Sequence, residues 1–387
     1  MARLLQLSPG VAPYDATLSL MLGIVRIFRR QGHYRHFDLA ARHVPSGFRI
    51  RGHGVSRNRV QSLDDLDLKK YSSEDLLIYH HGIASDAEGI IRQFPGNRFI
   101  VYHGLTPASF YLPYNLTVAG RLERGRRELQ RLASAFERAY CFSRVTESDL
   151  RESGYLNIRK VDPPLQDVWS NVQTSSDRAE GQPPLYENQR NHSEHPRSNF
   201  NPVILSVGRI VPNKNHEPLI RMMAYLRNLH PSARLILAGE LRPGLEHYHR
   251  HLKDLIRTLK LEENVELTGL VDAASLEKLW HRSNQYICSS LHEGYCIPLV
   301  EAMVRNLPVL YLKYSGSAAA ETMDGAGIGV STLDPSFLAE LVSELHTNET
   351  LYDSIVKTQH QRLQQLRPME LAQDILNQMA LVGGVDD

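Results

Sequence analysis

Two glutamates separated by seven residues are the first candidates for chemistry in this chain. They are Glu293 and Glu301, in the stretch SSLHEGYCIPLVEAM at residues 289–303. Two acids at this spacing could act as general acid and general base on a sugar. They could instead bind hydroxyl groups and transfer no proton. The rest of the sequence has to decide between these two chemistries.

Two basic residues follow an apolar run further upstream. In SVGRIVPNKNHEPLI, residues 206–220, an expected strand ends at Gly208, and Arg209 and Lys214 follow it with four residues between them. Ligands of open α/β sheets bind beyond the carboxyl ends of the strands. Two fixed cations there suit a diphosphate, because charge-assisted hydrogen bonds are worth about 1.5–3 kcal/mol each. A solvated basic loop is the other interpretation that this stretch alone allows.

The same reasoning places a helix start between the two glutamates. Pro298 is favoured in the first turn of a helix, so the helix is expected to begin there. Backbone N–H groups between Gly294 and Leu299 would point out of its end and could bind an anion. The two acids would then bracket the phosphates of a sugar nucleotide and bind hydroxyls at its ends. For Glu301 alone, a residue favoured by the helix dipole is the alternative.

Short apolar runs alternate with helical patterns along most of the chain. This alternation predicts parallel sheets covered on both faces, and its two series predict two α/β domains. The expected strands lie near residue 5 and at 76–80, 99–103, 139–143, 203–208, 234–239, 265–269, 286–290 and 308–312. The expected helices begin near His216 and lie at 121–140, 336–345 and 369–379.

A polar stretch separates the two series. Residues 166–201 are rich in Ser, Asn, Gln and Pro, and such a stretch buries little core. It is also longer than a compact connection needs. We therefore expect an N-terminal domain at 1–165, a linker or loop at 166–201 and a C-terminal domain at 202–365. A last helix within 366–387 is expected to pack back on the N-terminal domain.

Length, charge and cysteines limit the class of protein further. A chain of 387 residues is long for one core, and a net charge of +1 offers no field for nucleic acid. The three cysteines, Cys141, Cys288 and Cys296, lie in or beside apolar runs and fit reduced thiols. The N-terminal apolar run is too short for a signal peptide, and no apolar stretch reaches the length of a membrane span. We expect a soluble cytoplasmic protein.

Weaker signals concern membranes and metals. The arginines of the expected helix at 121–140 could meet anionic lipid headgroups at the inner membrane face or a lipid diphosphate acceptor. A core-facing helix with a basic outer face is the plainer interpretation. Asp65 and Asp67, and His247 and His251, have spacings that can bind metals. Both pairs are better explained as surface charge, and no metal is expected.

The motifs of the C-terminal half resemble the retaining glycosyltransferases of family four, which have the GT-B fold. The resemblance covers nearly all of residues 203–332 and rests on VGRIVPNKN, LILAGE, VELTGLV, SSLHEGYCIPLVEAM and NLPVL. It implies two Rossmann-like domains that face each other across a cleft. The C-terminal domain would bind a nucleotide diphosphate sugar, and the N-terminal domain would bind the acceptor. No cofactor is implied.

The resemblance also implies roles for single residues. Glu293 would bind hydroxyls of the donor sugar near the reacting carbon, and Glu301 would bind the ribose. Arg209 and Lys214 would hold the diphosphate. The rest of the implied donor site is Gly208, Gly294, the backbone amides of Tyr295, Cys296 and Ile297, and, near the base, Glu240 and Val271.

The N-terminal half resembles mannosyl- and related transferases of polysaccharide assembly. The matching stretches are DLLIYHHGIAS, FIVYHGLTPASFY, GRRELQRLA and CFSRVTESDLRESGY. By this likeness His103 faces the donor sugar, although a satisfied histidine at a strand end is also possible. PYDATLS, which contains Asp15, replaces the family's Gly-Gly loop, a departure that affects the usual loop contact to the phosphate. Asp15 and His80 are assigned to the acceptor side, and His80 and His81 also fit structural roles.

The resemblance, together with these residues, implies a retaining glycosyltransferase of polysaccharide biosynthesis. It would move a hexose, such as mannose, from a nucleotide diphosphate sugar to a saccharide or lipid-linked acceptor. His103, Arg209, Lys214 and Glu293 would be the catalytic residues, and the leaving phosphate would accept the acceptor's proton. The alternatives are a glycoside hydrolase, a GT-B epimerase or phosphorylase, and a non-catalytic binder of sugar nucleotides.

Overall fold

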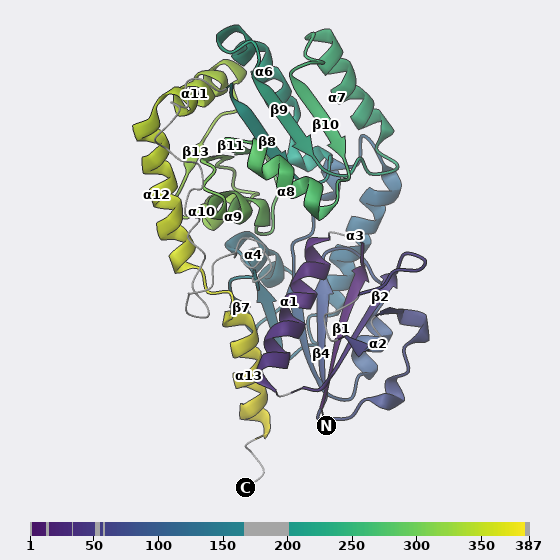
Figure 1. Ribbon diagram of the computed structural model, residues 1–387. Coiled ribbons are helices and arrows are strands. Elements are labelled where there is room, and N and C mark those ends of the chain that lie inside the picture. Colours follow the sequence, from purple (N-terminus) through teal and green to yellow (C-terminus); the bar gives the residue numbers. More distant parts are fainter. Residues whose placement is uncertain are drawn as a thin grey trace. The chain divides into compact units, whose positions relative to one another are not determined.

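The chain folds as two compact units, each built on one parallel sheet (Figure 1). A computed structural model describes residues 2–12, 15–32, 34–50, 55–56, 59–165 and 201–383. Unit 1 comprises Met1–Ala108, Thr117–Asp167 and Arg367–Asp387, and unit 2 comprises Ser109–Leu116 and Val168–Leu366. The expected linker at 166–201 lies outside the described residues, apart from residue 201.

The sheet of unit 1 has the strand order β3-β2-β1-β4-β5-β6-β7. The order reverses between β1 and β4, which makes this the topological switch point of the sheet. β4 is buried along its whole length and β1 along most of it, because helices cover both faces of a parallel sheet. The strands are β1 (Arg3–Gly10), β2 (His36–His43), β3 (Val60–Ser62), β4 (Leu76–His81), β5 (Asn97–Tyr102), β6 (Arg138–Cys141) and β7 (Ile158–Lys160).

The last helix of the chain belongs to unit 1. In Figure 1, α13 lies beside α1, and Asp374 of α13 accepts hydrogen bonds from Arg138 Nη1 (2.8 Å) and Tyr140 Oη (2.9 Å). The helices are α1 (Ala16–Gln31), α2 (Glu88–Gln93), α3 (Leu116–Arg131), α4 (Arg144–Glu152) and α13 (Glu370–Gly383), with short 3₁₀ helices η2 (Leu63–Asp65), η3 (Leu68–Lys70) and η4 (Ala108–Phe110).

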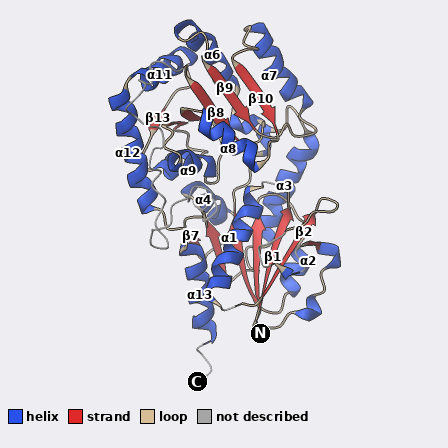
Figure 2. Cartoon of the chain, viewed as in Figure 1, coloured by secondary structure: helices blue, strands red, loops and turns tan. Residues whose placement is uncertain are grey.

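The sheet of unit 2 has the order β10-β9-β8-β11-β12-β13, with the switch point between β8 and β11. In Figure 2 its strands β8, β9 and β10 lie side by side in red. The strands are β8 (Val203–Val207), β9 (Arg234–Ala238), β10 (Val265–Gly269), β11 (Gln285–Cys288), β12 (Val309–Leu312) and β13 (Ile328–Val330). The helices are η6 (Pro212–Lys214), α6 (Glu217–Leu229), α7 (Glu246–Thr258), α8 (Ala273–Arg282), α9 (Ile297–Val304), α10 (Ala319–Met323), α11 (Pro335–Thr347) and α12 (Glu349–Gln365).

A short segment from the first half of the sequence belongs to unit 2. Within residues 109–116, Asn115 Nδ2 donates to the carbonyl of Gly244 (2.8 Å). The ring of Tyr114 lies edge-on to that of Tyr248, with 5.3 Å between centroids. The boundaries inferred from composition gave this segment to the N-terminal domain, because no polar or glycine-rich stretch marks it.

The secondary structure predicted from the sequence is largely confirmed. Every strand expected from the sequence is present. The sequence did not predict β2, β3, β7 and β13, because they are short edge strands or carry polar residues. The helix expected at 121–140 is wrong in its bounds. It occupies Leu116–Arg131, because the residues after it pair with β5 as strand β6. Among the described residues, no helix is both long enough and apolar enough to cross a membrane.

Two glycines of α3 have opposite surroundings. A Cβ at Gly125 would lie 2.8 Å from the backbone nitrogen of Ala84, whereas at Gly120 the nearest atom is 3.9 Å away. Next to Ala84, the N–H and hydroxyl of Ser85 donate to the buried carboxylate of Glu128, which holds this loop against α3. The loop therefore has little freedom to move away from a side chain at Gly125.

We expect Gly125→Ala to lower the free energy of unfolding by about 1–3 kcal/mol, because the added methyl group overpacks this contact. The matched Gly120→Ala change should raise it by up to about 1 kcal/mol, since alanine is the better helix former. Urea denaturation of both variants measures the difference. Equal stabilities would mean that α3 does not pack closely on this loop.

Candidate functional site

In unit 2 the loops after β8 and β11 are joined at the switch point of the sheet. Leu291 N–H donates to the carbonyl of Asn213 (2.8 Å), and Asn213 Nδ2 donates to the carbonyl of His292 (3.2 Å). Ser289 Oγ donates to the carbonyl of Lys214 (2.9 Å). The stretches that carry Lys214 and the first glutamate of the pair are therefore fixed to each other at the place where open α/β sheets bind ligands.

An ion pair between Lys214 and Glu293 lies at this junction. Lys214 Nζ donates to Glu293 Oε1, and the two side chains are 18% and 10% exposed. Burial alone would lower the pKa of Lys214, but the Glu293 carboxylate more than offsets this and raises it. Burial alone would raise the pKa of Glu293, but Lys214 brings it below its ordinary value. Both groups are therefore charged at neutral pH, and Glu293 is a poor proton donor.

Two glycines lie where a larger residue would crowd the Lys214 side chain or the turn that precedes it. Gly208 has φ of 151°, and a Cβ there would lie 3.2 Å from Lys214 Cε. A Cβ at Gly239 would lie 1.9 Å from the carbonyl oxygen of Gly208, so the turns after β8 and β9 are in direct contact. Arg209 follows with an exposed side chain, and the Glu240 carboxylate accepts from Arg242 Nε at 3.4 Å.

The second glutamate lies on the helix that starts beside Glu293. α9 begins at Ile297 with Pro298 in its first turn, as predicted, and Cys296 before it has φ of 72°. Glu301 is half-buried one turn into α9. Burial raises the pKa of Glu301, and Arg305 offsets part of that increase. Val271 is also half-buried and directly precedes Asp272, the N-cap of α8.

In unit 1, three polar side chains form a chain of hydrogen bonds across neighbouring strands. Gln6 lies on β1, His80 on β4, and His103 directly after β5. His80 Nε2 lies 2.8 Å from Gln6 Oε1, and His80 Nδ1 lies 3.0 Å from His103 Nε2. Burial lowers the pKa of His103 to about 3 and the pKa of His80 well below its usual value. Both imidazoles are therefore neutral at pH 7.

The side-chain amide of Gln6 determines which atom donates and which accepts in these hydrogen bonds. Gln6 Nε2 donates to the carbonyl of Met21 (2.9 Å), so the remaining Gln6 oxygen accepts from His80 Nε2. His80 Nδ1 then carries no proton and accepts from His103 Nε2. His103 is thereby fixed as the tautomer with its proton on Nε2 and a lone pair on Nδ1.

The other residues singled out from the sequence have structural partners. Asp15 is the N-cap of α1, and its side chain accepts from Thr17 N–H (3.3 Å). His81 is fully buried, with its Nε2 3.7 Å from Glu128. Asp67 caps η3, and His251 Nε2 lies 2.9 Å from Glu217. These contacts favour structural roles, and the acceptor-side assignment of Asp15 stays a prediction.

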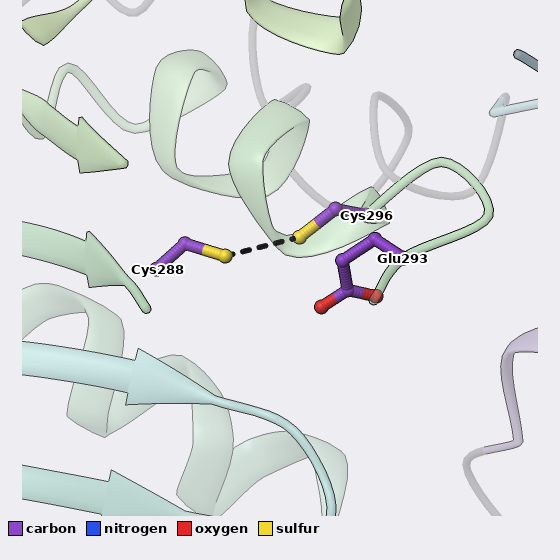
Figure 3. A group of neighbouring side chains, drawn as sticks. All are labelled: Cys288, Glu293 and Cys296. Carbon is purple, nitrogen blue, oxygen red and sulfur yellow. Dashed lines mark hydrogen bonds between the residues drawn. The ribbon is translucent and has the colours of Figure 1, made fainter. Parts of the chain in front are cut away.

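Sequence reasoning missed three features of these sites. The buried Asn213 joins the two loops, and Gln6 sets the tautomer of the histidines. The thiols of Cys288 and Cys296 lie 3.7 Å apart beside Glu293 (Figure 3). The two cysteines are separated by seven residues with the glutamate between them, and this spacing could have indicated the cluster.

Known proteins match the part of the chain that carries the Lys214–Glu293 pair. Residues 187–362 match the family described as "Glycosyl transferases group 1". The matched residues all lie in unit 2. The match includes both predicted glutamates, both predicted cations and the helix start between them.

Two relatives share part of this region. Mannosylfructose-phosphate synthase of Agrobacterium fabrum is 27% identical over 146 residues, which is 34% of this chain and 32% of that protein. An uncharacterized glycosyltransferase of Methanocaldococcus jannaschii is 32% identical over 108 residues, which is 28% of this chain and 25% of that protein. The chain thus spans about a third or less of the length of these relatives.

Solved structures match over almost the whole chain. Sucrose-phosphate synthase from Thermosynechococcus elongatus aligns with a TM-score of 0.67 and 16% identity over 98% of both chains. HepE of Anabaena, in complex with UDP-glucose, aligns with a TM-score of 0.67 and 15% identity over 98% of this chain and 100% of its own. The predicted GT-B fold, with two Rossmann-like domains, is confirmed.

The hydrogen-bond chain of unit 1 predicts a measurable tautomer. With ¹⁵N-labelled histidine, long-range ¹H–¹⁵N spectra should show the His103 ring neutral and protonated on Nε2 from pH 8 down to pH 5. Gln6→Met removes the acceptor for His80 and should leave His103 as a mixture of tautomers. Gln61→Met, the same change on edge strand β3, should leave the spectrum unchanged. A ring protonated on Nδ1 in the parent would contradict the assignment.

Proposed function

We propose that the chain is a retaining glycosyltransferase that moves a hexose from a nucleotide diphosphate sugar to a saccharide or lipid-linked acceptor. The observation that carries the proposal is the Lys214–Glu293 ion pair at the switch point of unit 2. The group 1 domain match over the same residues supports it. The donor-site roles of the residues around the pair are part of the proposal.

The ion pair explains how one site could hold both ends of the reacting bond. A diphosphate is a stronger ligand for an ammonium group than a single carboxylate, because it carries more charge on more oxygens. Bound phosphate would therefore draw Lys214 away from Glu293. The released carboxylate could then accept hydrogen bonds from sugar hydroxyls next to the bond that breaks. Binding of the donor thus converts an internal ion pair into two contacts with the substrate.

Stabilisation of the leaving diphosphate would supply most of the catalysis. Lys214 and the exposed Arg209 provide positive charge, and the backbone amides of Tyr295, Cys296 and Ile297 lie at the start of α9. The leaving phosphate would accept the proton of the acceptor hydroxyl on the same face of the sugar. These groups need no metal ion for this scheme, and none is proposed as a cofactor.

We assign the other proposed contacts with the donor from the position of each residue. Glu301, half-buried in α9, would accept from ribose hydroxyls, and Glu240 and Val271 would lie near the base. Gly208 would let the phosphates approach the backbone, and Gly294 would do the same beside Glu293. The lone pair on His103 Nδ1 would accept a hydroxyl of the donor sugar. Glycoside hydrolysis is disfavoured, because Glu293 stays ionised beside Lys214.

Names of similar proteins support the substrate class. The matched structure of HepE contains UDP-glucose, and one relative is a mannosylfructose-phosphate synthase, so we propose a hexose such as mannose or glucose. The three cysteines are free thiols, which supports a location in the cytoplasm. A lipid-linked acceptor would bring the protein to the inner face of a membrane. Ion pairs of Arg126 with Asp149 and Arg131 with Glu88 already engage two α3 arginines.

A panel of UDP, GDP, ADP and TDP tests the donor site without an acceptor. A nucleotide at about 100 times its Kd should add about 2.7 kcal/mol to the free energy of unfolding and raise Tm. The double variant Lys214→Met with Glu293→Gln leaves no unpaired buried charge and should lose this shift. Arg221→Ala, on the exposed face of α6, is the control and should keep it. A shift that persists in the double variant would place the nucleotide elsewhere.

Measurements of turnover test the proposed role of Arg209, the exposed cation, in stabilising the leaving group. Arg209→Ala should lower kcat/KM for transfer by about 10²–10³, because one charge-stabilising donor of the leaving group is lost. The measurement is nucleotide release with each sugar nucleotide that binds, in the presence and absence of saccharide and lipid-linked acceptors. Activity of Arg209→Ala within a factor of a few of the parent would overturn its role. Release that does not depend on acceptor would mean that the sugar nucleotide is hydrolysed or eliminated, and would count against transfer.

A further inference from the structure

Two thiols and a carboxylate form a buried cluster at the edge of the proposed donor site, to which Glu293 and the backbone of Cys296 belong. Cys288 ends β11, Glu293 lies on the following loop, and Cys296 directly precedes α9 (Figure 3). Their exposed fractions are 4%, 9% and 6%. One sulfur or oxygen atom from each lies within 4.8 Å of the other two. The three side chains thus come from a strand end, the loop that follows it and the residue before the next helix.

The spacing of the two sulfurs fits a tetrahedral metal ion. Zinc–sulfur bonds of about 2.3 Å at a tetrahedral angle hold two sulfurs about 3.8 Å apart. The Sγ atoms of Cys288 and Cys296 are 3.7 Å apart. A carboxylate oxygen is a common third ligand of zinc, and a fourth position is open to water in sites with three protein ligands. The side chains therefore need little rearrangement to bind such an ion.

The backbone at Cys296 is a second, independent observation. Its φ of 72° lies in the left-handed region, where glycine is unstrained and a side chain is disfavoured. A cysteine in this conformation places its thiol against that of Cys288, which glycine could not do. Backbone conformations of this kind concentrate at functional sites. The position thus combines strain with a metal-binding side chain.

We propose that Cys288, Glu293 and Cys296 bind a thiophilic divalent cation of the zinc class, and that this cation excludes the nucleotide diphosphate sugar. The second half rests on the proposed function, because it takes Glu293 as a donor-sugar ligand. The cation is an inhibitor in this scheme and takes no part in transfer. The site makes the enzyme responsive to free zinc.

Charge balance supports the site. Lys214 and Glu293 neutralise each other, and the two thiols are uncharged when protonated. A divalent cation that replaces both thiol protons adds two positive and two negative charges, so the net charge of the buried group does not change. Burial of uncompensated charge is the main obstacle to ion binding in a protein interior. Here the ligands and Lys214 together remove that obstacle.

Competition with the donor follows from the shared carboxylate. A Glu293 oxygen bound to the cation cannot accept a hydrogen bond from a sugar hydroxyl. Zinc should therefore raise the apparent KM for the donor and leave kcat unchanged. A saturating donor should in turn displace the cation.

Cobalt(II) tests the site directly, because tetrahedral cobalt bound to thiolate has characteristic near-ultraviolet and visible absorption bands. The reduced full-length chain should bind one cobalt ion with these bands, and zinc should abolish them. Cys288→Ser and Cys296→Gly should lose the bands, and the glycine also relieves the strained backbone. Cys141→Ser, which removes the third cysteine, should keep them. Absence of the bands in the parent, or their persistence in Cys288→Ser, overturns the metal site.

Inhibition of transfer by zinc tests, in a separate experiment, whether the cation competes with the donor. Zinc at saturation should raise the apparent KM of the parent for the donor at least tenfold, and a chelator should reverse this. Cys288→Ser should transfer at the parental rate without zinc and resist inhibition, since Cys288 has no role in donor binding. Cobalt bands with no transfer by the parent would overturn the proposed function and keep the site. Transfer that zinc does not inhibit, in a parent that shows the bands, overturns only the competition.

Discussion

The central interaction of unit 2 is an ion pair between a half-buried ammonium and a buried carboxylate. Neither charge could be kept in the interior of unit 2 alone, since an isolated buried charge is strongly unfavourable. Lys214 and Glu293 are held together by the hydrogen bonds that join the loops after β8 and β11. Under the proposed function, a ligand of this site would have to replace the partner that it takes away, which would favour molecules that carry both anionic and hydroxyl groups.

The topology of the sheets determines where such a pair can form. In both units the strand order reverses in the middle of a parallel sheet, and the loops on either side of the reversal diverge. In unit 2 this point carries the ion pair. In unit 1 the strands next to it carry Gln6 and His80, whose hydrogen bonds fix the tautomer of His103. The same architecture thus positions a charged group in one unit and a neutral hydrogen-bonding group in the other.

The sequence predicted the parts of the site that depend on local order. Continuous apolar runs reveal buried parallel strands, and Pro298 reveals the start of α9, because both signals lie within a few residues. The Lys214–Glu293 pair and the Gln6–His80–His103 chain were not predicted as contacts. Their members are 79 residues apart in the first case and up to 97 in the second, and only the sheet order brings them together.

The assignment of residues 109–116 to unit 2 has a consequence for how the protein can be divided. The chain passes from one unit to the other after residues 108, 116, 167 and 366, so no single cut yields two complete units. A fragment that stops in the polar stretch at 166–201 lacks α13 and leaves unit 2 without Tyr114 and Asn115. A chimera that takes unit 2 from a relative would have to replace its two segments together, and one that takes unit 1 would have to replace three.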